Sequence, residues 1–223
     1  MKSNDSFKPL LKKIKVVGFD FDDTLVDEQY SIQGRWKKVL KKYSYLSPIL
    51  LKTFFEVYKI KGFKYKRHIN LTLEKLGIDN KFVKPIVDDF LSSHYKEKLI
   101  PGVGELLKLL NHKGIKIGII TNGNQEYQER RIMKAGLTKF LDFVFYADKF
   151  KKPNPVFLKS CLMKLGVKNK SEFLYIGNDY LEDIKYAREL GIRSFLIGNK
   201  VIPGDYISFQ NLCELSDLIR ECD

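Results

Sequence analysis

The sequence has few of the residues that build disulfide frameworks or zinc sites. Its three cysteines, Cys161, Cys213 and Cys222, are odd in number and form no Cys-x-x-Cys pair, which argues against both kinds of site. Cys161 falls in an apolar pattern of helical period, so we expect a packed thiol there rather than a nucleophile. The three histidines show no ligand spacing, and we expect no histidine metal site.

Long hydrophobic runs are also missing. No apolar stretch approaches the roughly 20 residues that span a bilayer, and the residues after Met1 lack the apolar segment of a signal peptide. We therefore expect a cytoplasmic protein without a membrane partner. The chain of 223 residues is 44% hydrophobic and 30% charged, which is typical of a globular protein with one large domain or a core and a smaller insert.

Positive charge dominates part of the chain. The net charge is +13, and residues 27–100 hold 16 Lys and Arg against 8 Asp and Glu. A basic run of this kind is usually a solvated helix surface. Attraction of anionic substrates toward a site is a further hypothesis for the same charge. A nucleic-acid partner is not favoured, because the sequence holds no nucleic-acid-binding motif.

Apolar runs alternate with helix-like stretches along most of the chain. The runs predict buried parallel strands at residues 14–20, 115–121, 143–147, 172–177 and 193–197. Helical patterns cover residues 104–111, 125–135, 155–165 and 180–190. Glycine follows the last three, where a helix stop is expected. The alternation predicts an α/β fold with a parallel sheet covered on both faces.

One segment between the first two strands interrupts this alternation. Apolar residues recur there at helical spacing, Trp36 is expected in their core, and a further helix is expected to follow Asp79. We therefore predict two domains, a core of residues 1–26 and 99–223 and a helical domain of residues 27–98.

An acidic cluster follows the first predicted strand. Side chains alternate along an extended chain, so Asp20 and Asp22 share one side, whereas Phe19 and Phe21 point into the core. Two carboxylates about 5 Å apart repel by roughly 3 kcal/mol at an effective dielectric of about 20. A divalent cation such as Mg²⁺ would remove that penalty. The ordinary alternative is an acidic turn that caps a helix.

Two further polar segments follow later predicted strands. The segment Thr121-Asn122-Gly123 offers a hydroxyl and main-chain N–H groups to phosphate oxygens, although Asn-Gly is also a common turn. Lys152 stands in a Lys-Pro-Asn-Pro setting whose prolines stiffen the backbone. Neighbouring lysines are rivals for any role it has.

A second acidic segment follows the fourth predicted strand. Asp179 with Glu182 three residues later matches a capping box. As metal ligands, Asp179 or Asn178 would hold a cation together with Asp183, one helical turn further on. Capping and ligation are compatible with each other.

These polar segments follow successive strands of one predicted sheet. Open α/β sheets bind ligands beyond the carboxyl ends of their strands. We know of no purely structural reason for acid, Thr-Asn, Lys and acid to arrive at one edge in that order. The sequence therefore predicts a functional site there.

On these residues the sequence resembles the haloacid dehalogenase superfamily, over residues 14–198. The first motif of that family, Asp-x-Asp-x-Thr, is matched through Thr24. Asn178 stands where many members have Asp. The second acid of the first motif is typical of the phosphatase branch. Asp20 and Asp22 match the nucleophile and the acid of the first motif. Thr121 matches the hydroxyl residue of the second motif and Lys152 the lysine of the third. Asp179 and Asp183 match the acidic pair of the fourth.

The resemblance implies a Rossmann-like core, a helical cap after the first motif, and Mg²⁺ as cofactor. Asp20 would attack phosphorus to form an aspartyl-phosphate, and Asp22 would protonate the leaving oxygen and then activate water. Mg²⁺, Lys152 and the Thr121 region would offset the charge of the phosphoryl group. The metal ligands implied are Asp20 and Asp22 with Asn178, Asp179 or Asp183. Phosphoglycolate, sugar phosphates and nucleotides all stay open as substrates, and the oligomeric state is open.

Two other functions use similar residues. A receiver domain also places Asp, Thr and Lys at strand ends with Mg²⁺, but as a phospho-aspartate switch. Such domains are shorter, lack a helical insert and carry the phosphorylated Asp on a middle strand. A basic nucleic-acid-binding protein on a disused hydrolase fold is the second alternative, and the intact pair Asp20 and Asp22 argues against it.

Overall fold

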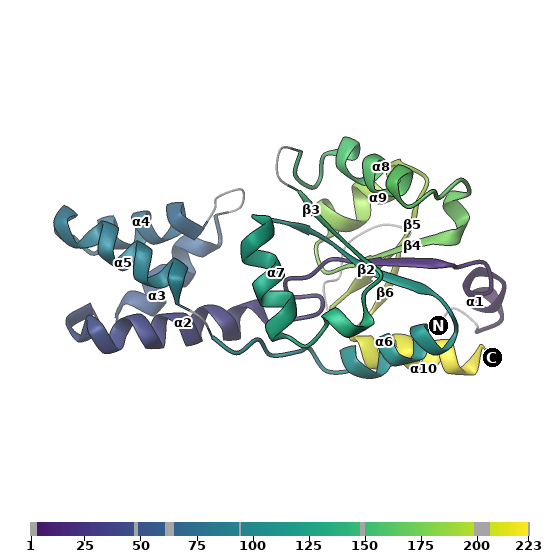
Figure 1. The fold of residues 1–223 in the computed structure, drawn as a ribbon, viewed down its shortest axis with the longest axis horizontal. Coiled ribbons are helices and arrows are strands. Elements are labelled where there is room, and N and C mark those ends of the chain that lie inside the picture. Colours follow the sequence, from purple (N-terminus) through teal and green to yellow (C-terminus); the bar gives the residue numbers. More distant parts are fainter. Residues whose placement is uncertain are drawn as a thin grey trace. The chain divides into compact units, whose positions relative to one another are not determined.

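The computed structural model describes residues 4–46, 49–60, 65–93, 95–147, 150–198 and 206–222. The chain divides into two compact units (Figure 1). Residues 1–27 and 97–223 form one, here called the core unit, and residues 28–96 form the other, the helical unit. The assignment of the helical unit as a cap stays a prediction.

A parallel sheet forms the centre of the core unit. Its strand order is β3-β2-β1-β4-β5-β6, and each neighbouring pair is parallel. This is the order of a Rossmann-like sheet, so the predicted α/β fold with a helical region between its first two strands is confirmed. The strands are β1 (Val16–Phe19), β2 (Lys116–Asn122), β3 (Phe143–Ala147), β4 (Phe173–Gly177), β5 (Arg193–Ile197) and β6 (Ile207–Phe209).

Helices connect and cover these strands. The chain patterns did not reveal the first helix, the last strand or the last helix, and β6 is too short to show a period. The helices of the core unit are α1 (Asn4–Leu11), α6 (Val103–His112), α7 (Gln125–Lys134), α8 (Pro155–Lys164), α9 (Tyr186–Glu189) and α10 (Leu212–Glu221). Gly136, Gly166 and Gly191 have φ between 66° and 72°, which confirms the predicted helix stops.

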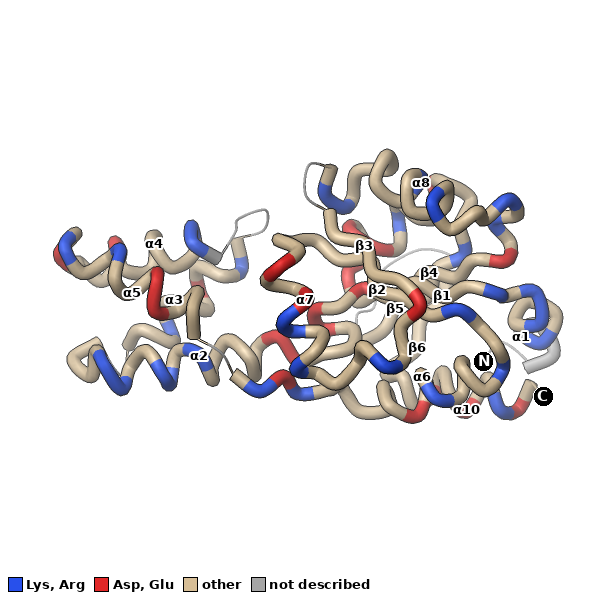
Figure 2. The backbone as a smooth tube through the Cα atoms, in the orientation of Figure 1, with Lys and Arg blue, Asp and Glu red and all other residues tan. Residues whose placement is uncertain are grey.

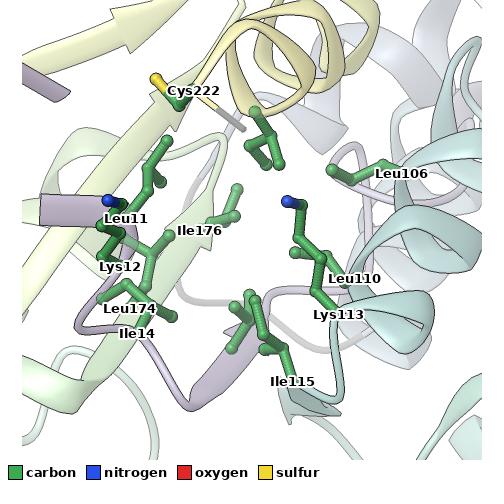
Figure 3. A pocket seen from close by; sticks show the side chains of 12 residues that line it. Leu11, Lys12, Ile14, Leu106, Leu110, Lys113, Ile115, Leu174, Ile176 and Cys222 are labelled. Carbon is green, nitrogen blue, oxygen red and sulfur yellow. The ribbon is translucent and has the colours of Figure 1, made fainter. Parts of the chain in front are cut away.

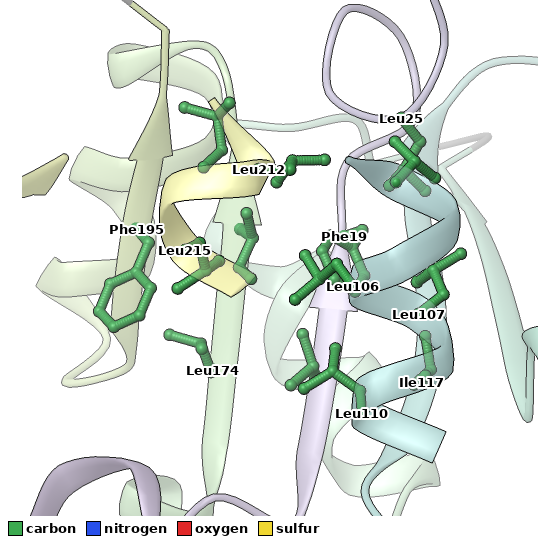
Figure 4. Close-up of a cluster of buried hydrophobic side chains, with 14 of the residues drawn as sticks. Phe19, Leu25, Leu106, Leu107, Leu110, Ile117, Leu174, Phe195, Leu212 and Leu215 are labelled. Carbon is green, nitrogen blue, oxygen red and sulfur yellow. The ribbon is translucent and has the colours of Figure 1, made fainter. Parts of the chain in front are cut away.

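The two faces of the sheet carry different clusters of buried side chains. Val17 and Phe19 of β1 pack with Leu106 of α6 and Leu215 of α10, and Figure 4 shows this face. Val16 points to the opposite face, which packs against α8 and includes the predicted core thiol of Cys161. Burial of each large apolar side chain contributes about 1.5–3 kcal/mol. The alternation therefore anchors β1 from both sides and fixes where its carboxyl end lies.

The helical unit has its own core. Trp36 is fully buried, and its ring centroid lies 4.7 Å from that of Phe90 and 5.4 Å from that of Phe54. The helix predicted after Asp79 is present, Asp79 caps it by accepting from the Lys81 N–H at 3.0 Å, and it continues past Pro85. The helices are α2 (Glu28–Lys42), α3 (Ile49–Tyr58), α4 (Tyr65–Lys75) and α5 (Asn80–Ser92).

Lysines and arginines recur along α2 and α4 (Figure 2). Lys37, Lys38, Lys41 and Lys42 are exposed on α2, so a solvated helix surface is confirmed there. Among the described residues, no helix is both long and apolar enough to cross a membrane.

A cavity of about 310 Å³ lies away from the predicted site residues. Figure 3 shows its mostly apolar lining, which includes Leu106 and Leu110 of α6 and Leu174 of β4. Ile14 and Ile115 precede β1 and β2 in the chain, so this cavity reaches toward the amino ends of the strands. Ligands of such sheets bind at the other edge.

Candidate active site

The loop after β1 places two carboxylates at the carboxyl end of the sheet. The Asp20 N–H donates to the Ile176 carbonyl at 2.8 Å, which ties the start of the loop to β4. Phe21 is fully buried, as predicted. The chain then turns through Asp23, whose φ of 55° lies in the left-handed region that Asp tolerates better than most residues. This turn follows directly on Asp22.

Lys152 joins Asp20 to a second buried carboxylate. Its Nζ donates to Asp20 Oδ1 at 2.5 Å and to Asp183 Oδ1 at 2.7 Å. The same ammonium lies 3.0 Å from the Tyr175 hydroxyl. All four side chains are buried. We call Asp20, Lys152, Asp183 and Tyr175 the Lys152 cluster.

Burial and neighbouring charges shift the protonation of this cluster. Burial raises the pKa of Asp20 to about 7, and the Lys152 ammonium acts in the opposite direction. For Lys152, burial acts to lower the pKa, but the carboxylates of Asp183 and Asp20 outweigh it and hold that pKa above its ordinary value. The lysine is therefore a permanent cation beside the carboxylate predicted to be the nucleophile.

Asn122 fixes the main chain of Lys152. The Lys152 N–H donates to Asn122 Oδ1 at 2.8 Å, and Asn122 Nδ2 donates to the Lys152 carbonyl at 3.3 Å. Of the rival lysines, Lys151 is exposed and Lys149 lies outside the described residues. The paired bonds set where the Lys152 side chain begins, so the ammonium reaches Asp20 from a fixed point.

Thr24 connects the first motif to the segment after β4. Its buried hydroxyl donates to Asp20 Oδ2 at 3.1 Å and lies 3.3 Å from Asn178 Oδ1. Two oxygen atoms therefore lie near one hydroxyl group, whose single proton can be donated to only one of them at a time. Thr24 supports the loop, as the sequence led us to expect.

In the segment after β4, the side chains of Asp179 and Asp183 have different roles, although the Asp179 N–H donates to Asp183 Oδ2 at 3.0 Å. Asp179 Oδ1 accepts from the Leu181 and Glu182 N–H groups at 2.8 and 3.0 Å, which is the capping arrangement. The helix predicted at 180–190 is a π-helix over Tyr180–Lys185 followed by α9. The turn brings Asp183 against Gly177, where an added Cβ would lie 2.4 Å from the Asp183 Cγ. Glycine at this position therefore lets Asp183 reach Lys152.

Asp22 lies in a separate network. The Arg131 Nη1 is 2.6 Å from Asp22 Oδ1, and Arg131 forms a two-point pair with Glu97 at 2.9 and 3.1 Å. Gln128 Nε2 donates to Asp22 Oδ2 at 3.2 Å. We call Asp22, Arg131, Glu97 and Gln128 the Arg131 cluster. It was not foreseen, because Arg131 and Glu97 are far apart in the chain and stand in no recognised motif.

The Thr-Asn-Gly turn contacts the Arg131 cluster. The Thr121 hydroxyl is buried and accepts from Gln128 Nε2 at 3.3 Å, and the Asn122 carbonyl accepts from the same nitrogen at 3.1 Å. Gly123 has a φ of 135°, and a Cβ there would lie 3.1 Å from Gln128 Nε2. The structure thus brings Thr121 and Gly123 beside the partner of Asp22.

Oxygen atoms would have to hold a metal at this edge. In the part of the chain that the structure describes, no three His, Cys, Asp or Glu side chains group as a metal site. The oxygens that meet at Thr24 belong to Asp20 and Asn178. Carboxylate and amide oxygens are hard donors that suit Mg²⁺. The donor set fits the predicted cofactor. Asn178 is a simpler second ligand beside Asp20 than Asp183 is, because Asp183 Oδ1 already accepts from Lys152.

The fold and the site match those of one hydrolase family. A model of the haloacid dehalogenase-like hydrolase family matches residues 17–197. The chain belongs to this family, and the predicted membership on its phosphatase-like side is confirmed.

Several curated relatives of the chain are named as phosphatases. Glyceraldehyde 3-phosphate phosphatase of Pyrococcus furiosus is 28% identical over 194 residues, which cover 82% of this chain and 80% of that protein. Phosphoglycolate phosphatase of Aquifex aeolicus is 27% identical over 220 residues, which cover 94% of this chain and 97% of that protein.

Solved structures share the fold. The HAD-hydrolase YfnB from Bacillus subtilis, bound to magnesium, is 18% identical with a TM-score of 0.73 and covers 93% of this chain and 99% of its own. A 2-haloacid dehalogenase from Pseudomonas syringae pv. tomato is 24% identical with a TM-score of 0.65 and covers 94% of this chain and 100% of its own. At this identity the likeness concerns the fold alone.

Proposed function

We propose that this haloacid dehalogenase-like phosphatase hydrolyses a small phosphorylated metabolite through an aspartyl-phosphate on Asp20, with Mg²⁺ as cofactor. The observation that supports it most is the contact of Lys152 Nζ with Asp20 Oδ1 at 2.5 Å, in a cluster completed by Asp183. A buried cation that holds one oxygen of a carboxylate orients the other and offsets the charge of an incoming phosphoryl group.

The charges of the two clusters support a divalent cation. Among the residues described here, the Lys152 cluster and the Arg131 cluster each contain two carboxylates and one cation. With all of these groups ionised, each cluster has a formal charge of −1. A phosphate anion would be repelled from such a site, and Mg²⁺ would supply the missing positive charge and polarise the phosphoryl oxygens. Asp20 and Asn178 are the side chains proposed to hold it.

The first chemical step joins phosphorus to Asp20. An Asp20 carboxylate oxygen attacks phosphorus, the bond from phosphorus to the leaving oxygen breaks, and Asp22 gives that oxygen a proton. Lys152 keeps Asp20 oriented during this attack. Main-chain N–H groups near Gly123 and the Thr121 hydroxyl are proposed to bind phosphoryl oxygens.

The second step releases inorganic phosphate. Asp22, now a carboxylate, takes a proton from water, the water oxygen attacks phosphorus, and the bond between phosphorus and Asp20 breaks. The side chain of Asp22 is 23% exposed and that of Asp20 is 10% exposed. The more accessible carboxyl is thus the one assigned to exchange protons with water and the leaving group.

The relatives suggest which substrates to try first. Two- and three-carbon phosphates such as phosphoglycolate and glyceraldehyde 3-phosphate are the substrates named for the curated relatives. We propose this size class here, with the helical unit acting as the cap. A dehalogenase role is disfavoured. Asp22 is an acid, whereas the dehalogenase branch of the family lacks an acid at this position.

A phosphate-release screen with and without chelator tests the proposal. Wild-type protein and Asp20→Asn are assayed with Mg²⁺ on a panel of phosphorylated metabolites that includes these two compounds. We expect activity that the chelator removes and that Asp20→Asn lacks. Activity that resists the chelator, or an active Asp20→Asn, would overturn the mechanism.

A further inference from the structure

Of the Arg131 cluster, only Asp22 takes part in the steps above, and Arg131, Glu97 and Gln128 have no role in them. The Arg131 side chain is 4% exposed and that of Glu97 is 1% exposed. The guanidinium carbon also lies 4.9 Å from the ring centroid of Phe21, within the loop that carries Asp22. Burial of an arginine is costly unless its charge and its N–H groups are satisfied. Here the two-point pair with Glu97, the amide oxygen of Gln128 and the Phe21 ring face satisfy them, and the Asp22 carboxylate lies within ion-pair distance of the same guanidinium.

We propose that Arg131 is a positioning residue that orients the Asp22 carboxyl toward the leaving oxygen, and that Glu97 holds Arg131 in place. The inference rests on the proposed phosphatase function. Arg131 Nη1 lies 2.6 Å from Asp22 Oδ1, while Nε and Nη2 are taken up by Glu97. The planar fork fixes the direction of Nη1, because its other two nitrogens already donate to Glu97.

Gln128 restricts the position of the other oxygen of the Asp22 carboxyl. Its amide nitrogen lies 3.2 Å from Asp22 Oδ2, and its amide oxygen accepts from Arg131 Nη1 at 3.2 Å. Arg131 and Gln128 lie about one turn apart on α7 and therefore share a face of this helix. Both oxygens of Asp22 are thus set by one rigid element, which is what a proton donor needs to meet a leaving oxygen at a fixed place.

Glu97 occupies a distinctive point in the chain. It is the residue at which the core unit resumes after the helical unit. Its carboxylate neutralises the guanidinium, so that Asp22 is oriented by a pair of zero formal charge rather than by an isolated cation. Replacement of Glu97 is therefore expected to impair the same step as replacement of Arg131.

Leaving-group dependence distinguishes orientation of a proton donor from a general structural role. Phenyl phosphate has a leaving group that needs a proton, since a phenol has a pKa of about 10, whereas the 4-nitrophenolate released from 4-nitrophenyl phosphate leaves readily without one. The parameter kcat/KM covers events up to departure of that group. We therefore compare kcat/KM for these two probes with Mg²⁺ in wild type, Arg131→Met, Arg131→Lys and the double variant Arg131→Met/Glu97→Met.

The double variant guards against unfolding, because it removes both charges of the Arg131–Glu97 pair and leaves neither of these two side chains buried without its partner. Arg131→Lys keeps the charge but loses the fork. Arg130→Met is the matched control, since Arg130 is the neighbouring arginine on α7, has a side chain 47% exposed and pairs with Glu126. Circular dichroism and thermal unfolding establish which variants are folded.

We expect the folded Arg131 variants to lose about tenfold or more in kcat/KM on phenyl phosphate relative to 4-nitrophenyl phosphate. Arg130→Met should keep the wild-type ratio. Equal losses on both probes would overturn the positioning role while leaving the phosphatase proposal intact. A wild-type protein that hydrolyses neither probe, or an Asp20→Asn variant as active as wild type, would overturn the proposed function itself and the inference with it.

Discussion

Asp20 and Asp22 are two residues apart in the chain, but they lie in two different buried networks of similar composition. Each carboxyl contacts one cation, each cation contacts a second carboxylate, and a polar uncharged side chain completes each set. The cations differ. Lys152 is a point charge whose one nitrogen serves several oxygens, whereas Arg131 divides its nitrogens between Glu97 and Asp22.

The difference matches the work proposed for each carboxyl. A nucleophile needs an adjacent positive charge that also meets the developing charge of the phosphoryl group, which a single ammonium provides. A proton donor and acceptor needs a fixed direction, which a planar fork provides. Two clusters of similar formal charge can therefore have different roles, one attracting the phosphoryl group and the other orienting a proton donor.

The largest effects on kcat are expected from replacing the two carboxyls, of which only Asp20 is proposed to bond covalently to phosphorus. Asp20→Asn removes the nucleophile, and we expect kcat to fall by about 10⁴-fold or more with no covalent phosphoenzyme. Asp22→Asn removes only proton transfer, and we expect a fall of about 10²–10⁴-fold in which phosphoenzyme still forms with 4-nitrophenyl phosphate. Acid-quenched protein analysed by mass spectrometry checks both. Phosphoenzyme on Asp20→Asn, or none on a folded Asp22→Asn, would break the comparison.

The next effect concerns stability. Lys152→Met leaves two buried carboxylates facing each other, and we expect unfolding free energy to fall by about 3–5 kcal/mol. Arg131→Met should cost a similar amount, but the added change Glu97→Met should recover most of it, because no buried charge then lacks a partner in that pair. Urea unfolding of the three variants measures this. Failure of Glu97→Met to recover stability would show that the Arg131 cluster is held by more than its charge pairing.

A smaller effect follows from the raised pKa of Asp20. Its pKa is about 7 in the folded protein against an ordinary 3.8, so the unfolded chain ionises first as pH rises. Stability from this group is thus present below pH of about 4 and lost as pH rises through about 7. Asp20→Asn should therefore stabilise the metal-free protein at pH 8 by about 1–3 kcal/mol, and less toward pH 4. Urea unfolding in chelator tests this, and a gain that does not grow with pH would contradict it.

The smallest expected effect lies outside both clusters. Neither cluster has a net positive charge when all of its groups are ionised, so attraction of an anionic substrate is expected to come from the basic helical unit. We expect kcat/KM to fall a few-fold, about 3–10, when ionic strength rises from about 20 to about 200 mM. Changing the exposed α2 lysines Lys37, Lys38, Lys41 and Lys42 to Gln should flatten this dependence. An efficiency that salt leaves unchanged would exclude steering.

Much of the fold followed from local patterns. The strands Phe143–Ala147 and Arg193–Ile197 have the predicted bounds, whereas β1 is shorter at both ends than the predicted 14–20. The first turn of the predicted helix at 180–190 is a π-helix. Its apolar spacing is nearly that of an α-helix, so the sequence pattern does not distinguish the two helix types.

The order of apolar runs and polar segments in the sequence predicts that acid, Thr-Asn-Gly, lysine and acid lie at one edge of a parallel sheet. This follows from hydrophobic periodicity, because parallel strands bring their carboxyl ends together. The folded structure establishes which atoms meet there. It placed Asp183 on Lys152, brought Asn178 to the Thr24 hydroxyl, and paired Arg131 with Glu97 across 34 positions of the chain. Such pairings depend on packing and on the satisfaction of buried charges, which are properties of the folded chain rather than of any segment of it.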